Sequence, residues 1–249
     1  MAKIVSVHSF RGGTGKSNTT ANVATILASE GRRVGVVDTD LASPGIHVLF
    51  GMPGEEVTRP LNEFLWDQCA IQDCAHDMST DLGVDGKLFL LPASLKPGAI
   101  TRILRQGYDA QKLTGGFRDL IKALDLDVLM IDTHPGLNQE TLLSLVISHA
   151  VVIVMRPDQQ DYEGTGVTVQ VARQLKVPSM QIVVNKVPTT FDPDQVRAQV
   201  QETYACEVGA VLFHSDEMMT LASGGIFSLH YPDHPLTQEF KQAAAKLVK

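Results

Sequence analysis

The sequence predicts a doubly wound α/β fold, in which a mostly parallel sheet carries helices on both faces. Short apolar runs rich in β-forming residues alternate with stretches of helical periodicity, which is the pattern of repeated βαβ units. The apolar runs are nearly continuous, as expected for strands that are covered on both sides. Of the 249 residues, 44% are hydrophobic and 20% are charged, so a large core can be buried, and we expect a single domain over residues 1–249.

The expected elements follow one another along the whole chain. Strands are expected over residues 4–8, 34–38, 88–91, 128–132, 151–155, 182–185 and 208–213. Helices are expected over residues 16–30, 110–124, 138–148, 161–175, 193–203 and about 236–248. Residues 41–86 interrupt the alternation with several prolines and glycines, and this composition indicates a switch-like loop with short helices rather than a second domain.

Composition and charge exclude several classes of protein. The formal net charge of -7 argues against a strongly basic nucleic-acid binder. Three sparse cysteines fit a reducing compartment better than a disulfide framework. The N-terminal apolar run is too short for a signal peptide, and no run has the length of a membrane span, so we expect a cytoplasmic protein.

A glycine-rich loop lies between the first expected strand and the first expected helix, and its sequence is Gly12-Gly13-Thr14-Gly15-Lys16-Ser17. Glycines in such a loop let backbone N–H groups turn toward an anion, and the following helix N-terminus adds further N–H groups and partial positive charge. In this context Lys16 is expected to reach the β- and γ-phosphates of a nucleotide, and the Ser17 hydroxyl to bind Mg²⁺. Asn18, one residue further on, belongs to the same expected nucleotide-binding set.

Acidic residues end two of the expected strands. Asp38 and Asp40 close the second strand, and Asp132 closes an apolar run in the manner of a Walker B motif. Carboxylates at the C-terminal ends of parallel strands point into the ligand crevice of such folds. We therefore expect Asp132 to hold Mg²⁺, directly or through water, and Asp38 and Asp40 to address the metal or a water molecule.

The strand expected over residues 182–185 ends in Asn185, followed by Lys186. An Asn carboxamide offers a donor and an acceptor, which suits the edge of an adenine base. Asn185 is therefore a candidate for base recognition, and a simple cap of the strand end is the competing interpretation.

These motifs resemble those of the MinD/ParA family, whose deviant Walker A loop reads x-Lys-Gly-Gly-x-Gly-Lys-Ser/Thr. The match is Gly12, Gly13, Gly15, Lys16 and Ser17, and Arg11 occupies the place of the signature lysine. The resemblance implies that Arg11 reaches the partner's phosphates across an ATP-bound homodimer, that Asp40 positions the attacking water and that Asp38 lies near the metal. It also implies that Asn185 lies by the adenine, with residues 213–217 on the other side of the base. The family's Asp-x-Pro-x-Gly motif is kept at Asp132 and Gly136, but His134 replaces its proline.

Features that other functions of this superfamily require are missing or weak in this sequence. An iron–sulfur role needs paired cysteines, and the chain has no Cys-x-x-Cys. The C-terminal apolar stripe of Phe240, Ala244 and Leu247 is modest, so packing on the domain is favoured over membrane binding. Basic residues between 102 and 122 leave nonspecific DNA binding open, although a solvated helix face is the favoured interpretation.

The combined expectation is an ATPase that binds ATP and Mg²⁺, hydrolyses ATP slowly and dimerises around it. Such a protein would act as a nucleotide switch that positions or partitions a cargo and is controlled by an activating partner protein. Nucleotide would order residues 39–50 and 133–140, as γ-phosphate contacts order switch loops. The alternative is a nucleotide-dependent protein-interaction module that does not hydrolyse ATP.

Overall fold

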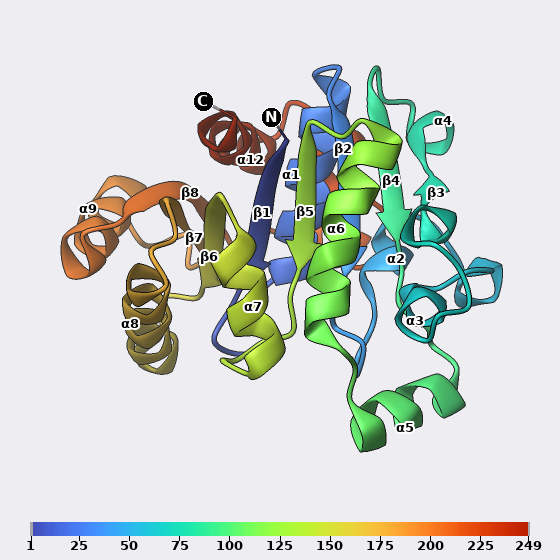
Figure 1. Ribbon diagram of the computed structural model, residues 1–249. Coiled ribbons are helices and arrows are strands. Elements are labelled where there is room, and N and C mark those ends of the chain that lie inside the picture. Colours follow the sequence, from blue (N-terminus) through green and yellow to red (C-terminus); the bar gives the residue numbers. More distant parts are fainter. Residues whose placement is uncertain (1, 249) are drawn as a thin grey trace.

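The computed structural model describes residues 2–248 and places their strands in one eight-stranded sheet with the order β3-β4-β2-β5-β1-β6-β7-β8 (Figure 1). The parallel strands are β1 (Lys3–His8), β2 (Arg33–Asp38), β4 (Lys87–Leu91), β5 (Val128–Asp132), β6 (Ala150–Met155), β7 (Ser179–Val187) and β8 (Glu207–Phe213). The short strand β3 (His76–Asp77) pairs antiparallel with β4 at one edge. The predicted mostly parallel α/β fold is confirmed.

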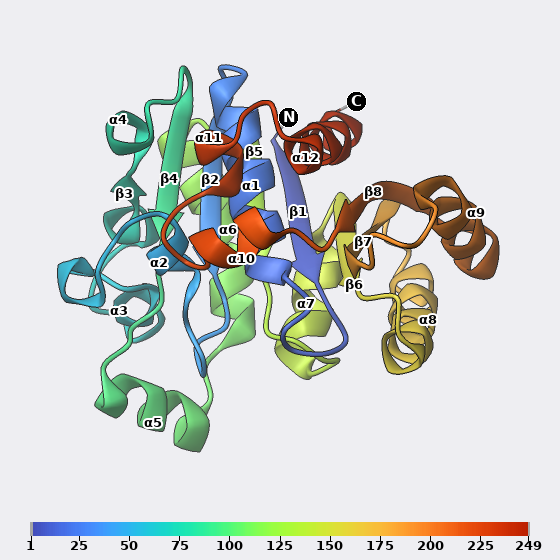
Figure 2. The same cartoon turned by 180° about the vertical axis from the view of Figure 1, so that it is seen from behind.

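Helices cover both faces of the sheet (Figures 1 and 2). The longer ones are α1 (Lys16–Ser29), α5 (Pro97–Gln106), α6 (Ala110–Leu124), α7 (Gln139–Ile147), α8 (Gln159–Gln174), α9 (Pro193–Tyr204) and α12 (Pro235–Leu247). The shorter ones are α2 (Ile46–Leu49), α3 (Leu61–Leu65), α4 (Ser79–Leu82), α10 (Asp216–Leu221) and α11 (Phe227–His230), with 3₁₀ turns η1 (Gly54–Glu56) and η2 (Ile71–Cys74). Helices α1 and α12 pack on one face, whereas α6, α7, α8 and α9 pack on the other.

The alternation of side chains along each strand explains why the strands are apolar throughout. Val128 and Met130 point into the core under α1 and α12, and Leu129 and Ile131 point into the core under α6. All four are buried, so β5 has no solvent-facing side. Since β1 lies between β5 and β6, the loop after β1 opens at the centre of the sheet, at the C-terminal ends of the strands.

The C-terminal segment packs on the domain, as the sequence predicted. Phe240, Ala244 and Leu247 of α12 are buried against α1 and β8. None of the helices within residues 2–248 is long and apolar enough to cross a membrane. The predicted interruption over residues 41–86 also appears as short helices, two 3₁₀ turns and the edge strand β3.

Candidate nucleotide-binding site

The loop between β1 and α1 has the backbone of an anion-binding turn. Gly13 and Gly15 have φ values of 77° and 96°, a left-handed conformation that favours glycine. Gly15 is also the N-cap of α1, and no side chain caps the free N–H groups of this helix end. A Cβ atom at Gly15 would collide with the Asn185 side chain. Both the positive φ and this lack of space therefore favour glycine at position 15.

The side chain of Asp132 gathers the polar groups that follow this loop. Its Oδ1 atom lies 2.9 Å from Lys16 Nζ and accepts a 2.9 Å hydrogen bond from Thr20 Oγ1. Its Oδ2 atom accepts a 2.7 Å hydrogen bond from Ser17 Oγ. Asp132 and Lys16 are both buried. The structure thus brings together the lysine, the hydroxyl and the Walker B carboxylate that the sequence predicted.

Asp38 lies beside Asp132 because the two residues are in register on the neighbouring strands β2 and β5. The Asp38 carboxylate is buried and accepts hydrogen bonds from the backbone N–H groups of Asp40 at 3.0 Å and Gly45 at 3.2 Å. Burial, with the adjacent Asp132 charge as a second cause, raises the pKa of Asp38 to about 7, although Lys16 opposes the shift. Two carboxylates this close favour a bound cation between them and the phosphates.

Asp40 and the segment after β5 face each other across the same crevice. Asp40 Oδ1 lies 3.8 Å from His134 Nε2, and burial raises the pKa of Asp40. The segment after β5 is tied to β1, since Thr133 Oγ1 donates to the Val7 carbonyl at 3.0 Å and lies 2.9 Å from His8 Nδ1. The two expected switch segments, 39–50 and 133–140, therefore start from fixed points next to Asp132.

Arg11 points toward α8 of its own chain. Its Nη1 atom lies 3.7 Å from Asp158 Oδ1 and 3.6 Å from Asp161 Oδ1. Arg156 contacts the same two carboxylates, at 3.1 Å each. The Arg11 side chain is 40% exposed, so it lies at the surface next to the loop rather than inside the phosphate site.

A cavity of about 450 Å³ continues from the loop between β7, β8 and α10, and Asn185 lines it together with Phe213, His214 and Ser215. This is the place at which the sequence analysis expected the base. The Asn185 amide is engaged, however: Nδ2 donates to the Thr14 carbonyl at 2.8 Å, and Oδ1 accepts from the Lys186 N–H at 2.8 Å. Asn185 therefore lies in the expected place but binds the phosphate loop.

The donor set fits Mg²⁺ better than a transition metal. Ser17, Asp38 and Asp132 offer hard oxygen atoms, and Mg²⁺ is usually held by one or two carboxylates together with substrate phosphates. Among residues 2–248, no group of three or more His, Cys, Asp or Glu side chains could hold a metal ion by itself.

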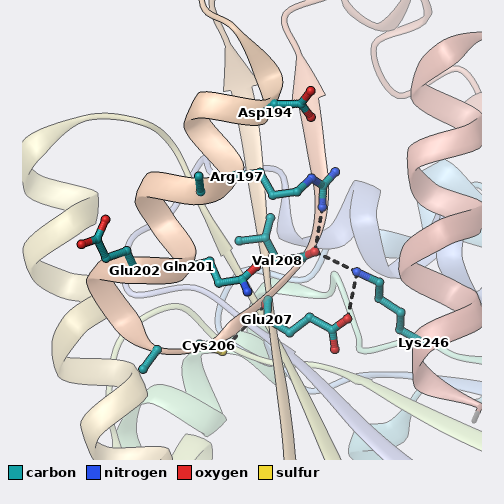
Figure 3. A pocket seen from close by; sticks show the side chains of 10 residues that line it. Asp194, Arg197, Gln201, Glu202, Cys206, Glu207, Val208 and Lys246 are labelled. Carbon is teal, nitrogen blue, oxygen red and sulfur yellow. Dashed lines mark hydrogen bonds and ion pairs between the residues drawn. The ribbon is translucent and has the colours of Figure 1, made fainter.

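A larger hollow, of about 920 Å³, lies elsewhere, between α9, β8 and the end of α12 (Figure 3). Three of its charged side chains, Arg197, Glu207 and Lys246, take part in hydrogen bonds or ion pairs at the strand. Arg197 Nη1 and Lys246 Nζ both donate to the Val208 carbonyl, at 2.8 and 2.9 Å, and Lys246 also pairs with Glu207 at 3.0 Å. These three side chains therefore close the edge of the sheet at Val208.

Comparison with known proteins gives the family. A family model described as ParA, NUBPL iron-transfer P-loop NTPase, matches residues 1–248. The chain belongs to this ParA family of P-loop NTPases. An uncharacterized ATP-binding protein of Methanocaldococcus jannaschii is 26% identical over 248 residues, which cover 100% of this chain and 88% of the relative. An iron-sulfur cluster carrier protein of Saccharolobus solfataricus is 25% identical over 259 residues, covering 98% and 82%.

Solved structures of the ParA family share the fold. The septum site-determining protein MinD from Pyrococcus horikoshii, complexed with Mg-ADP, aligns with a TM-score of 0.83 at 20% identity and covers 100% of this chain and 97% of that one. MinD from Pyrococcus furiosus aligns with a TM-score of 0.82 at 19% identity, covering 99% and 98%. The resemblance to MinD/ParA proteins drawn from the motifs is confirmed.

The structure adds two residues that the motif analysis did not select. Thr20 reaches Asp132 because it lies one helical turn after Lys16, and this spacing alone was available as a signal. Lys186 Nζ donates to the Gly13 carbonyl at 2.9 Å, across 173 positions of sequence, and no local pattern predicts that contact.

Proposed function

We propose that this ParA-family protein is a nucleotide switch that binds ATP, hydrolyses it slowly and dimerises around it to position or partition a cargo. The observation that carries the proposal is the set of contacts around Asp132, which joins Lys16, Ser17 and Thr20 at the start of α1. A lysine and a hydroxyl at a helix N-terminus, beside a buried carboxylate, are the parts that hold phosphate and its cation in P-loop NTPases.

The residues predicted to hold phosphate, metal and water each have a proposed part in this reaction. The backbone of Gly12, Gly13, Thr14 and Gly15 with the Lys16 ammonium would bind the phosphates, and Asn18 lines the neighbouring cavity. Ser17, Asp38 and Asp132 would hold Mg²⁺, which when bound would neutralise charge on the β- and γ-phosphates. Asp40, the more exposed carboxylate, would orient the attacking water.

The nucleobase cavity favours adenine over guanine. Guanine presents N–H donors on its Watson–Crick edge, and a carboxylate is the side chain that matches them. Among the described residues that line the 450 Å³ cavity, none is Asp or Glu, and apolar side chains such as Phe213 and Met218 predominate beside His214 and Ser215. This lining supports the proposal of ATP as the nucleotide.

The cysteines support a positioning switch rather than a cluster carrier, although several relatives are named iron-sulfur cluster carrier proteins. Cys74 and Cys206 are buried, and burial raises the pKa of both thiols, to about 12 for Cys74. Only Cys69 is partly exposed, and its Sγ lies 3.5 Å from Cys74 Sγ within one loop. A cluster shared between two subunits needs paired thiols at the surface, and of the three cysteines only Cys69 is partly exposed.

We also infer that residues 1–249 form one domain, as predicted from the sequence. A single sheet takes strands from both halves of the chain, and α12 returns to pack on α1 and β8. A cytoplasmic location remains a prediction of the same proposal. An activating partner protein and nonspecific DNA binding stay open alternatives, and a solvated helix face remains the favoured interpretation of the basic residues.

A steady-state phosphate-release assay tests the proposal. We expect Lys16→Ala to weaken ATP binding by about 100-fold or more because it removes the cation facing the phosphates. Asp40→Ala should keep ATP binding and lower hydrolysis by about 100-fold, the usual worth of a group that assists proton transfer or positions water. Equal hydrolysis by wild type and Asp40→Ala, with and without DNA, would favour the non-hydrolysing interaction module.

A further inference from the structure

The end of strand β7 is bonded to the phosphate loop at two consecutive carbonyl groups. Lys186 Nζ donates to the Gly13 carbonyl at 2.9 Å, and Asn185 Nδ2 donates to the Thr14 carbonyl at 2.8 Å. The two side chains are also joined, since the Lys186 N–H donates to Asn185 Oδ1 at 2.8 Å. These bonds connect parts of the chain that are more than 170 positions apart.

Peptide geometry gives these bonds a consequence for the opposite side of the loop. In a trans peptide the C=O group and the following N–H group point in opposite directions, and none of the described peptide bonds is cis. A Gly13 carbonyl held toward Lys186 turns the Thr14 N–H away from β7, and a Thr14 carbonyl held toward Asn185 does the same to the Gly15 N–H. Successive N–H groups held on one side form an anion-binding concavity.

The backbone at Lys186 is shaped for this contact. Its φ value is 57°, a left-handed conformation that a residue with a Cβ atom rarely adopts. The pairing of β7 with β8 also shifts register between Val184 and Val187, so the strand is irregular where Asn185 and Lys186 leave it. A strained conformation kept next to a binding loop is a frequent mark of a functional position.

We infer that Lys186 and Asn185 are positioning residues that brace the phosphate loop, so that both side chains contribute to phosphate binding through the loop backbone. The inference rests on the proposed function and adds to it the residues that orient the loop. Neither side chain touches the reacting atoms, since both act through the Gly13 and Thr14 carbonyls.

The test compares two probes, Mg²⁺-ATP and Mg²⁺-tripolyphosphate, by calorimetry. Lys186→Gly removes the ammonium and relieves the backbone strain at the same position. Lys176→Gly is the matched control, because Lys176 is an exposed lysine with a φ of 58° in the turn between α8 and β7. Lys186→Arg keeps a donor, and Asn185→Ala removes the second bond.

We expect Lys186→Gly and Asn185→Ala each to weaken both probes by a similar factor, about tenfold, as for the loss of one hydrogen bond. Lys176→Gly should bind like wild type, Lys186→Arg should retain most of the affinity, and Lys186→Gly should unfold at a temperature no lower than wild type. Loss of ATP affinity in Asn185→Ala with unchanged tripolyphosphate affinity would show that Asn185 reads the base, and would overturn the inference. Wild-type affinity of Lys186→Gly for both probes would also overturn it, whereas a wild-type protein that binds neither probe would refute the proposed function itself.

Discussion

At the scale of single residues, the ionisation of the buried Asp38 carboxyl makes the stability of the folded protein depend on pH. Its pKa of about 7 in the folded protein lies above the ordinary value of 3.8. At pH values between these two, the carboxyl is therefore protonated in the folded state and ionised in the unfolded state. The stability that this proton provides is complete below about pH 4 and is lost as the pH rises through 7. A cation bound nearby would oppose this protonation, because it favours the ionised form of the Asp38 carboxylate.

We therefore expect Asp38→Asn to stabilise the protein relative to wild type by a few degrees in Tm at pH 8, and to do so much less at pH 5. The Asp40 and Gly45 N–H groups bond to different oxygens of Asp38, so the amide oxygen keeps an acceptor for one of them, while the charge is gone. Thermal unfolding in the presence of a chelator measures the effect. Asp119→Asn, at an exposed position of α6, is the control and should show the same difference from wild type at both pH values; an Asp38→Asn profile parallel to wild type would contradict the prediction.

At the scale of elements, the free edge of β8 is closed by side chains rather than by another strand. Arg197 from α9 and Lys246 from α12 meet at the Val208 carbonyl (Figure 3). Further along the strand, Glu239 accepts a 2.7 Å hydrogen bond from the Val211 N–H. Open strand edges pair with other edges, and charged side chains are a common means of preventing this.

The double variant Arg197→Ala/Lys246→Ala should expose the Val208 carbonyl and promote self-association at high concentration. We also expect a loss of about 1–3 kcal/mol in the free energy of unfolding, because a partly buried acceptor loses both donors. Light scattering across a concentration series and chemical denaturation give the two quantities. Arg118→Ala/Lys241→Ala removes the same charges from exposed helix positions and should stay monodisperse; equal association of both double variants would argue against an edge effect.

The elements with strong local patterns were predictable, and those set by distant contacts were not. The strand over 128–132 has four apolar residues before Asp132 and appears with those limits, and the helix over 110–124 does too. Helix α5 was missed although Ile100, Ile103 and Leu104 recur in it at helical spacing; of these three residues only Ile103 is buried in the structure. Strand β3 was missed because two residues carry no pattern, and its pairing is set by β4.

The candidate site shows the same division. Lys16, Ser17 and Asp132 were identified from motifs, and the structure brings them within hydrogen-bonding distance. The partners of Arg11 and Asn185 were not predicted, because they depend on how α8 and β7 pack against the loop. The order of the strands, and so the register of Asp38 with Asp132, likewise lies beyond local sequence patterns.

For the whole molecule, Arg11 is the residue whose present partners conflict with a role across a dimer. It can contact phosphates of a second subunit only after leaving Asp158 and Asp161. Dimerisation should therefore depend on the charge of this acidic pair as well as on Arg11 itself.

We expect Asp158→Asn to strengthen ATP-dependent dimerisation several-fold, because it weakens the hold on Arg11 while an Asn keeps the N-cap of α8. Arg11→Ala should bind ATP as a monomer. Sedimentation velocity with a slowly hydrolysed ATP analogue measures both, and Asp194→Asn serves as a control acid at the start of α9. Unchanged dimerisation in Arg11→Ala would remove the proposed role of this residue.

The ion pair between Lys16 and Asp132 has a consequence for the order of loading. While Lys16 Nζ lies 2.9 Å from Asp132 Oδ1, the positive charge of the lysine offsets the negative charge of the carboxylate. A hydrated divalent ion without nucleotide would therefore be attracted less strongly to this carboxylate. If a bound triphosphate drew the ammonium away, the same carboxylate would be free to act as a ligand of the ion. We therefore expect the protein to bind free Mg²⁺ only weakly at cellular concentrations, and to bind Mg²⁺ and nucleotide together as a complex.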